Sequence, residues 1–393
     1  MPRIVVTCQR DIDTLNRVID NNLHLLFGKN KMDKISFYKD QLLKSINSLT
    51  ILPYGQKGRW VTTREPGMCM SRSDGTCDIE MYSFIKDRPE QDLYTIHEYA
   101  HELWHALINY LNYQGTKSKE KHTFDADGRP VTKIPFGGSI YERDEYDHNQ
   151  IRTLGKMTME TTVDILTSGS LIANQNSYRQ NGTTLDTVFK ERYDKWNDSS
   201  TGYSIFTSLT RLWIAAFSNS ANIGYDATFQ NGSSIFDCKV TLRNGYTVLT
   251  NSYLHNLLHN PLAIEEEYDQ IMGRGKYERL MVKVDNTFNE YLRTRTITDE
   301  MKKVIKSFMT EVSNFVNART AYLQSIGILT SQEINALRSS YNRIWNTLQG
   351  EYKTFFTQAD INEIARKAQA SKNKFSYITN NCIPDDSFVK KMI

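Results

Sequence analysis

The chain has 393 residues, of which 39% are apolar and 24% are charged, a balance typical of a soluble globular protein with a large core. Its 48 basic and 45 acidic residues give a net charge of +3 without any basic block, so the sequence gives no indication of nucleic-acid binding. The length suits two or three domains, or one catalytic unit with an appended helical bundle.

Neither the cysteines nor the termini indicate a secreted or membrane protein. Five cysteines are too few and too scattered for a disulfide framework; Cys69 and Cys77 can face each other across a hairpin, but reduced thiols are expected. The N-terminus lacks the features of a signal peptide, and no segment approaches the roughly 20 apolar residues that span a bilayer. We therefore expect a cytoplasmic protein with no membrane span, with signal-independent export left open.

The first ninety residues mix helical and strand-like periodicity. Two helical segments and then two strand-like segments are predicted, at Asp11–Leu26, Phe37–Leu52, Trp60–Thr63 and Asp78–Tyr82. Turn signals separate the two strand-like segments. A small sheet is therefore expected before a helix that runs from about Pro89 to Tyr113.

The remainder of the chain is mostly helical by its pattern. Residues 114–150 are polar and contain several glycines, which predicts a loop with room for a hairpin. Helical patterns return at residues 151–174 and at Ser204–Phe217, with a polar stretch between them. From about residue 252 onward nearly every segment has helical periodicity, including Asp299–Gln324.

Residues 97–105 read His-Glu-Tyr-Ala-His-Glu-Leu-Trp-His, which are two overlapping copies of His-Glu-x-x-His. Positions i and i+4 lie on one helix face, so two histidines at this spacing can bind one zinc ion. A glutamate directly after the first histidine points beside the metal and can take a proton from the attacking water. Three histidines in this row span roughly 12 Å along the axis, too far for one tetrahedral ion.

The second copy, residues 101–105, is favoured over the first, residues 97–101. Apolar residues surround it and small Ala106 follows it, whereas charged Glu102 follows the first copy. An apolar surrounding keeps the electric field at a metal site strong. The predicted roles are His101 and His105 as zinc ligands with Glu102 as the catalytic base, and His97 and Glu98 as the alternative ligand and base.

A pair of carboxylates in the next strongly patterned helix supplies further candidates. Glu160 and Asp164 are four residues apart and share a helix face, although their neighbours are apolar. Buried carboxylates are costly unless they have partners. Catalytic zinc takes three protein ligands, so Glu160 can be the third. Asp164 can then accept the second N–H of a ligating histidine.

At this point the sequence resembles the gluzincin branch of the zincin metallopeptidases, which have the thermolysin-like architecture. Ala100–Tyr110 is similar to the active-site helix of that branch, and Glu160-xxx-Asp164 is similar to its third-ligand helix. The chain departs from the family in the 54 residues that separate His105 from Glu160, a longer connection than usual. It also has Met159 where the family often has Asn.

A looser resemblance is to uncharacterised bacterial proteins with a Glu-Gly-x-Thr-Glu helix and a later Gly-Tyr before an apolar helix. Thr201-Gly202-Tyr203 and Ile205–Phe217 fit that pattern, and anthrax-lethal-factor-like toxins are a more distant comparison. The resemblance implies an α+β fold with a zincin-like catalytic region, a small β-sheet and a mostly helical chain. Its expected divisions are N-terminal helices and the small sheet in 1–90, zinc-binding helices and active-site loops in 91–250, and a helical C-terminal region in 251–393.

By this resemblance the chain is expected to be a zinc-dependent peptidase that cleaves a peptide or protein substrate. The cofactor is Zn²⁺, and the oligomeric state is not predicted. The alternative function is a non-catalytic protein-binding module on the same scaffold, with the C-terminal helices as its contact surface. The intact Glu102 argues against this alternative, because a site that has lost its catalytic activity does not need the catalytic base.

The substrate side of the site has weaker sequence signals. A side-chain donor often helps to stabilise the oxyanion of peptide hydrolysis; Tyr203 is the first candidate, with Tyr141 and His148 as alternatives. The resemblance also implies an edge strand that holds the substrate backbone, for which Cys77–Ser83 is the candidate.

Other histidines and acids are expected to be structural. His255 and His259 are four residues apart, but no glutamate follows His255 as it does in the zinc-binding motif. We therefore interpret them as residues on one face of a helix. Glu142, Glu145 and Asp147 belong to a charge run that is typical of a solvated surface.

Overall fold

A computed structural model describes residues 3–6, 8–27, 32–63, 65–72, 74–86, 88, 92–116, 120–173, 204–220, 239–352 and 356–367. Within these residues the fold is mixed α+β and mostly helical, which confirms that part of the predicted fold class. No described helix has the length and apolar character that crossing a membrane requires.

The N-terminal sheet has four strands, β1 (Arg3–Val5), β2 (Ile46–Leu52), β3 (Gly67–Ser71) and β4 (Cys77–Tyr82). Their spatial order is β1-β2-β4-β3, in which β1, β2 and β4 are parallel and β3 is antiparallel to β4. The predicted strand at Asp78–Tyr82 is therefore confirmed, but it lies inside the sheet with every residue buried. The expectation that Cys77–Ser83 forms the edge was wrong, because β3 pairs along its outer side.

Two further expectations for this region were wrong. The segment Phe37–Leu52 was predicted to be one helix. Helix α2 (Met32–Ser45) ends at Ser45 instead, because Ile46–Leu52 pairs with both β1 and β4 as strand β2. Trp60–Thr63 is not a strand. Its backbone is held instead by the carboxylate of Glu80, which accepts N–H groups from Arg59, Trp60 and Val61.

Helix α1 (Gln9–Phe27) packs against helix α3 (Asp92–Thr116). The bounds of α3 agree with the helix predicted from about Pro89 to Tyr113. The apolar side chains of α3 recur every three or four residues and are almost completely buried, which is the pattern of a helix enclosed on several sides. They are Ile96, Ala100, Leu103, Trp104 and Leu107. The helix therefore has a fixed rotation about its axis, and its polar row faces one direction.

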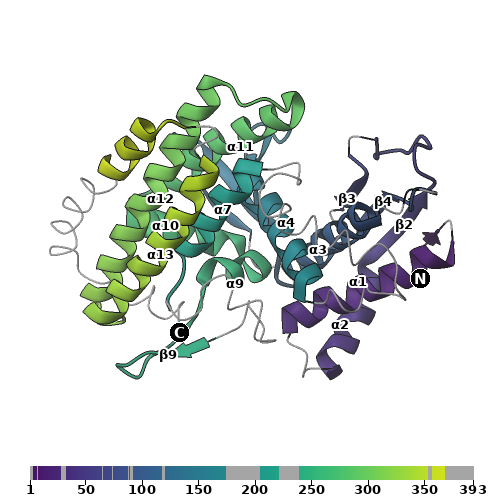
Figure 1. The fold of residues 1–393 in the computed structure, drawn as a ribbon, viewed down its shortest axis with the longest axis horizontal. Helices are drawn as coiled ribbons and strands as arrows, with labels where there is room; N and C mark the ends of the chain where they lie inside the picture. The colour runs from purple at the N-terminus through teal and green to yellow at the C-terminus, as the bar shows by residue number, and fades with distance from the viewer. Residues whose placement is uncertain are drawn as a thin grey trace.

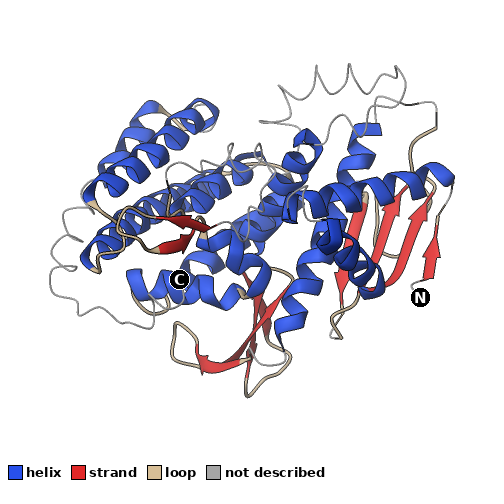
Figure 2. Cartoon of the chain, turned by 90° about the horizontal axis from the view of Figure 1, so that it is seen from below, coloured by secondary structure: helices blue, strands red, loops and turns tan. Residues whose placement is uncertain are grey.

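A second sheet fills most of the segment that was expected to be a loop. It is an antiparallel meander of β5 (Lys121–Phe124), β6 (Pro130–Phe136), β7 (Ser139–Asp144) and β8 (Ile151–Leu154). Gly128, Gly137 and Gly138 lie in the turns between these strands, so the prediction of a single hairpin fell short. Figure 2 shows the two sheets as separate groups of strands.

The remaining described elements are mostly helices. They are α4 (Lys156–Ala173), α7 (Ser204–Ala216), α9 (Ser252–His259), α10 (Pro261–Met272), α11 (Lys276–Thr294), α12 (Asp299–Ser325) and α13 (Ser331–Tyr352), with a hairpin of β9 (Lys239–Thr241) and β10 (Thr247–Leu249). The N-terminal sheet lies at one end of the molecule and α10 to α13 at the other, with α3 and α4 between them (Figure 1). The predicted helical C-terminal region is confirmed within residues 252–352 and 356–367.

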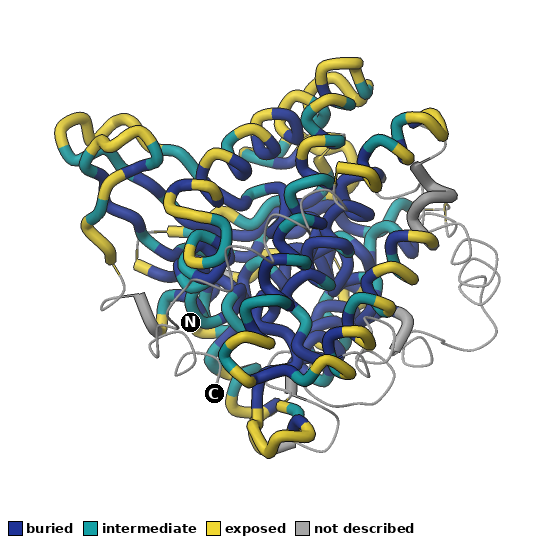
Figure 3. The backbone as a smooth tube through the Cα atoms, turned by 90° about the vertical axis from the view of Figure 1, so that its left-hand side faces the viewer, coloured by how far each residue is buried: buried dark blue, intermediate teal, exposed yellow. Residues whose placement is uncertain are grey.

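One apolar core runs through these parts. Its buried members extend from Leu15 to Ile364 and include Trp104 of α3 and Trp213 of α7. The buried stretches gather in the middle of the molecule, with the exposed turns at its rim (Figure 3). The three predicted divisions therefore share a continuous core, and where independent units begin and end stays a prediction.

Candidate metal centre

Three side chains from two packed helices converge on one point. His105 Nε2 lies 3.0 Å from His101 Nε2, and Glu160 Oε2 lies 3.2 Å and 3.7 Å from those two nitrogens. Helix α3 supplies the histidines and α4 supplies the glutamate. These three residues, called the histidine cluster below, form one of two groups with the spacing of a metal site within the described residues.

The shape of this triangle fits a tetrahedral ion. Bonds of about 2.0–2.2 Å to a central zinc place neighbouring ligand atoms about 3.3–3.6 Å apart. The three separations, 3.0, 3.2 and 3.7 Å, bracket that value. Two imidazoles and a carboxylate are also a donor set that zinc prefers. Glu160 has no ion pair with a Lys or Arg among the described residues, so none of those cations takes the place of a metal ion.

The electrostatics of the cluster favour a bound cation. Burial raises the pKa of the Glu160 carboxyl, but the charges and hydrogen bonds of His105 and His101 outweigh burial and lower it overall. Burial likewise lowers the pKa of His101, yet its bond to Glu160 and the charges of Glu102 and Glu160 raise it to about 9. Without a metal, the positive charge that the carboxylates need is thus supplied by a proton on His101.

Glu102 lies beside this triangle in a dry environment. It is 5% exposed, and burial is the main reason that its pKa rises to about 7, while the charges of His101 and His105 act in the opposite direction. A carboxyl group with a pKa near neutrality is suited to taking up and releasing a proton.

Glu102 also lies against the edge strand β3, at Gly67. A Cβ atom added at Gly67 would lie 2.8 Å from Glu102 Oε1 and 3.0 Å from Glu98 Oε2. Any larger residue would displace these carboxylates, so the absence of a side chain lets β3 approach the polar row of α3. The edge strand therefore passes directly beside the predicted base.

Asp164 does not have the partner that the sequence suggested. Its Oδ1 lies 3.2 Å from Nε2 of His97, whereas a ligating histidine, His101 or His105, was expected. Its Oδ2 accepts a hydrogen bond from Thr207 of α7 at 3.4 Å. The reason is the helix rotation: Asp164 lies one turn beyond Glu160 on α4, opposite the part of α3 that precedes His101. His97, the alternative ligand, is not a member of the histidine cluster.

The start of α4 is held by the C-terminal region. Asp285 of α11 accepts the backbone N–H groups of Gly155 and Met157 at 2.8 and 2.7 Å. These are donors that a helix N-terminus leaves without intrahelical partners. Burial raises the pKa of Asp285 to about 6, although these backbone bonds lower it. Asp285 thus fixes the helix end that lies one turn before Glu160.

The turn between β6 and β7 packs near the same two helices. Gly138 has a φ of +83°, and a Cβ atom there would lie 2.9 Å from Met159 of α4 and 3.1 Å from Ile108 of α3. Its backbone N–H donates to Asn112 Oδ1 at 2.9 Å. A residue with a side chain is disfavoured at this position by both backbone and space. The second sheet is thereby tied to the helices that carry the cluster.

The oxyanion candidates occupy different places. Tyr203 lies outside the described residues. Burial raises the pKa of Tyr141 on β7, its hydrogen bond with Thr153 lowers it, and the charge of Glu160 raises it further, which places Tyr141 within electrostatic reach of the cluster. His148 lies in an exposed turn, where its ring contacts the backbone oxygen of Asp144 at 3.2 Å. Tyr141 is therefore the described candidate whose pKa responds to the charge of the cluster.

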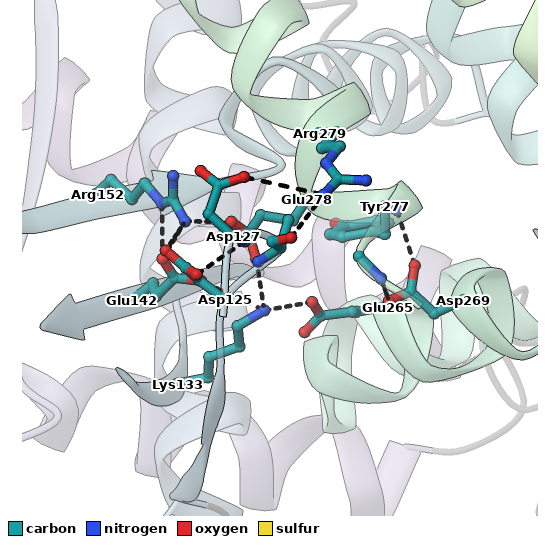
Figure 4. Close-up of polar contacts among 12 residues, drawn as sticks. Asp125, Asp127, Lys133, Glu142, Arg152, Glu265, Asp269, Tyr277, Glu278 and Arg279 are labelled. Atoms are coloured by element: carbon teal, nitrogen blue, oxygen red, sulfur yellow. Dashed lines mark hydrogen bonds and ion pairs between the residues drawn. The ribbon is translucent and has the colours of Figure 1, made fainter. Parts of the chain in front are cut away.

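The second group with metal-site spacing is Asp125, Glu142 and Glu278, all of them buried. Lys133 Nζ lies 3.3 Å from both Glu142 and Glu278 and also pairs with Glu265, while Arg152 pairs with Glu142 and Glu278 (Figure 4). We call these six residues the ion-pair cluster. Glu142, expected on a solvated surface, is 3% exposed because β7 pairs between β6 and β8 and turns it toward α11.

Two remaining sequence signals have plain structural outcomes. His255 and His259 share helix α9 with ring centroids 4.6 Å apart and are half-buried, as the helix-face interpretation requires. Cys69 and Cys77 are both free. A hydrogen bond with Cys77, together with burial, raises the pKa of the Cys69 thiol well above its usual range, and the charges of Glu102 and Glu160 add to this. The sequence did not place a thiol near the cluster; the register of β3 on β4 does.

Compared with known proteins, the chain matches no family model, no curated protein and no solved structure.

Proposed function

We propose that this chain is a zinc-dependent peptidase with His101, His105 and Glu160 as the metal ligands. The observation that carries the proposal is the convergence of their three donor atoms, with separations of 3.0–3.7 Å, beside the buried carboxyl group of Glu102. A ligand set of two imidazoles and one carboxylate leaves the fourth position of a tetrahedral ion open, as catalytic zinc sites do.

When bound, the zinc ion supplies a Lewis acid that polarises the scissile carbonyl and activates a water molecule. Glu102 takes the proton of the attacking water, since it follows His101 directly and lies beside the ligand triangle. It then passes the proton to the nitrogen of the leaving amine. Tyr141 is the described side chain that we assign to stabilising the oxyanion, and Tyr203 stays the candidate outside the described residues.

The arrangement around the helices supports the thermolysin-like resemblance. A single antiparallel edge strand, β3, lies against α3 at Gly67, which suits an extended peptide whose backbone pairs with that edge. The long connection between His105 and Glu160 is the main departure from the family. It consists largely of the second sheet, an addition that leaves α3 and α4 in contact.

The proposal is tested with Glu102→Gln, which preserves the shape of the side chain but cannot take a proton. Hydrolysis of a peptide library should fall about 10²–10⁴-fold, as loss of a general base typically causes, while zinc content stays at the wild-type value. Glu98→Gln is the matched control, one turn earlier on the same helix, and should cost much less. Wild-type hydrolysis by Glu102→Gln with zinc bound would refute the peptidase mechanism, and no turnover by zinc-loaded wild type would favour the binding-module alternative.

A further inference from the structure

His97 and Asp164 form a buried contact between the two helices of the metal centre. Nε2 of His97 lies 3.2 Å from Oδ1 of Asp164, and the two residues are 7% and 2% exposed. Thr207 of α7 donates to the other carboxylate oxygen at 3.4 Å. A carboxylate so far from water is stabilised only when its partners are in place.

The contact between His97 and Asp164 lies about one helical turn from the histidine cluster along both α3 and α4. Asp164 follows Glu160 by four residues on α4, which is a rise of about 6 Å, and His97 precedes His101 by four residues on α3. The two helices therefore meet at two successive levels, one formed by His97 and Asp164 and the other by the histidine cluster. Moving α4 along α3 by one turn would break both levels together.

We propose that His97 is a positioning residue: through Asp164 it fixes the register of α4 on α3 and so places Glu160 at the metal. This inference rests on the proposed zinc site. The positioning role of His97 also explains why the sequence holds two overlapping copies of the motif. The first histidine of one copy, His97, holds Asp164, and the first histidine of the other, His101, binds the metal.

The ring orientations agree with this division of roles. The rings of His101 and His105 are 4.7 Å apart at an interplanar angle of 71°, which brings their Nε2 atoms together. The rings of His97 and His101 are 6.0 Å apart and nearly parallel at 27°, and Nε2 of His97 lies 3.2 Å from Oδ1 of Asp164 rather than beside Nε2 of His105.

The test measures zinc affinity by competition with a chromophoric chelator, and the visible absorption of the Co²⁺-loaded protein. His97→Ala and Asp164→Ala should each weaken zinc binding about 10- to 100-fold, the usual cost of losing a residue that orients a ligand. The double variant should be no weaker than the weaker single variant, because both act through one contact. His97→Gln, whose amide N–H can reach Asp164, should recover most of the affinity and the wild-type Co²⁺ spectrum.

Tyr253→Phe is the matched control for a merely structural effect. The Tyr253 hydroxyl is buried and donates to the Thr158 backbone oxygen at 3.1 Å, so its loss also removes a cross-helix bond to α4. That variant should lower Tm while zinc affinity and the Co²⁺ spectrum stay unchanged.

Several outcomes would overturn the role of His97. If His97→Ala binds zinc with wild-type affinity, His97 has no positioning role. If His97→Ala loses the metal as completely as His105→Ala does, His97 is itself a ligand. The Tm of the metal-free protein gives a separate readout: each alanine variant should lower it by about 2 °C or more, and the double variant should lower it no further. A wild-type protein that binds no zinc would refute the proposed function, while this Tm coupling would still report on the contact itself.

Discussion

The histidine cluster and the ion-pair cluster both gather metal-capable side chains, but they differ in donor type and in the charges that lie among those side chains. Each contains three metal-capable side chains within 4.8 Å of one another, brought together from separate elements. In the ion-pair cluster, Lys133 and Arg152 lie among the carboxylates and offset part of their negative charge. In the histidine cluster no Lys or Arg of the described chain pairs with Glu160, and the charge is left for a proton or a metal ion.

The comparison teaches that close packing of acidic groups does not by itself indicate a metal site. An ion must compete with the cations that the protein already supplies, and Lys133, which is 3% exposed, is held by three carboxylates. Two imidazoles, in contrast, can exchange their proton for zinc without leaving a charge uncompensated. We therefore expect the two clusters to respond in opposite ways to metals and to substitution.

The largest expected effect is on zinc content. His105→Ala should reduce the metal from about one zinc per chain to near zero, because it removes one of three ligands. Glu142→Gln, a substitution in the ion-pair cluster, should leave zinc content unchanged in the folded protein. Metal analysis after dialysis measures both. Zinc retained by His105→Ala but lost by Glu142→Gln would reverse the assignment of the two clusters.

Next in size is the effect of removing the central cation of the ion-pair cluster. Lys133→Met keeps the approximate volume but leaves Glu142, Glu265 and Glu278 without it, which should cost about 3–5 kcal/mol of unfolding free energy. Millimolar Ca²⁺ should restore part of this stability in the variant and have no effect on the wild type. Urea unfolding with and without Ca²⁺ measures this, and a variant as stable as wild type would show that the cluster is not held by Lys133.

The pH dependence of zinc affinity is expected to be intermediate in size. In the metal-free protein the pKa of His101 is about 9, raised from 6.5, so zinc must displace a proton at neutral pH. Affinity should fall by up to tenfold for each unit of pH below 9. The raised pKa also stabilises the metal-free fold fully below pH 6.5, a contribution lost as pH rises through 9.

Chelator competition between pH 6.5 and 8 measures this slope. An affinity independent of pH over that range would mean that His101 is already neutral when zinc binds. Repeating the series with Glu142→Gln should give the wild-type slope, since that residue belongs to the other cluster.

The smallest effect is expected at the rim of the ion-pair cluster. The side chain of Arg129 is 55% exposed and donates to Asp125 at 2.9 Å. Asp125 also accepts backbone N–H groups from Asp127 and Arg129, so Arg129→Ala leaves its carboxylate satisfied. We expect a loss of at most about 1 kcal/mol in urea unfolding. If Arg129→Ala lost as much unfolding free energy as Lys133→Met, the exposed ion pair of Arg129 would stabilise the fold as strongly as the buried ion pairs of Lys133.

Several predictions from the sequence depended only on local spacing, and these agree best with the structure. The helices that carry His101 and Glu160 follow from apolar residues at three- and four-residue intervals. The same spacing places His101 and His105 on one face. Helix α12 (Asp299–Ser325) was likewise expected almost to its ends, at Asp299–Gln324.

Where local patterns are ambiguous, pairing partners decided the outcome. Leu42, Ile46 and Leu49 have helical spacing, yet Ile46–Leu52 became β2 because β1 and β4 lie on either side of it. Glu142 reads as a surface acid in a run of charges, yet the register of β7 turns it toward Lys133 and Arg152. The strands that pair with β2 are distant in sequence, whereas Lys133 and Arg152 lie opposite Glu142 on the neighbouring strands β6 and β8.

The sequence by itself determined the residue types of the proposed metal centre and the two helices that present them, because helical periodicity is a property of neighbouring residues. Only the tertiary structure decided that Asp164 meets His97, that β3 forms the edge beside Glu102, and that Asp285 holds the start of α4. Each of these contacts depends on the relative rotation or register of elements that are distant in the chain. Those quantities are set by the packing of the whole core, which no short segment encodes.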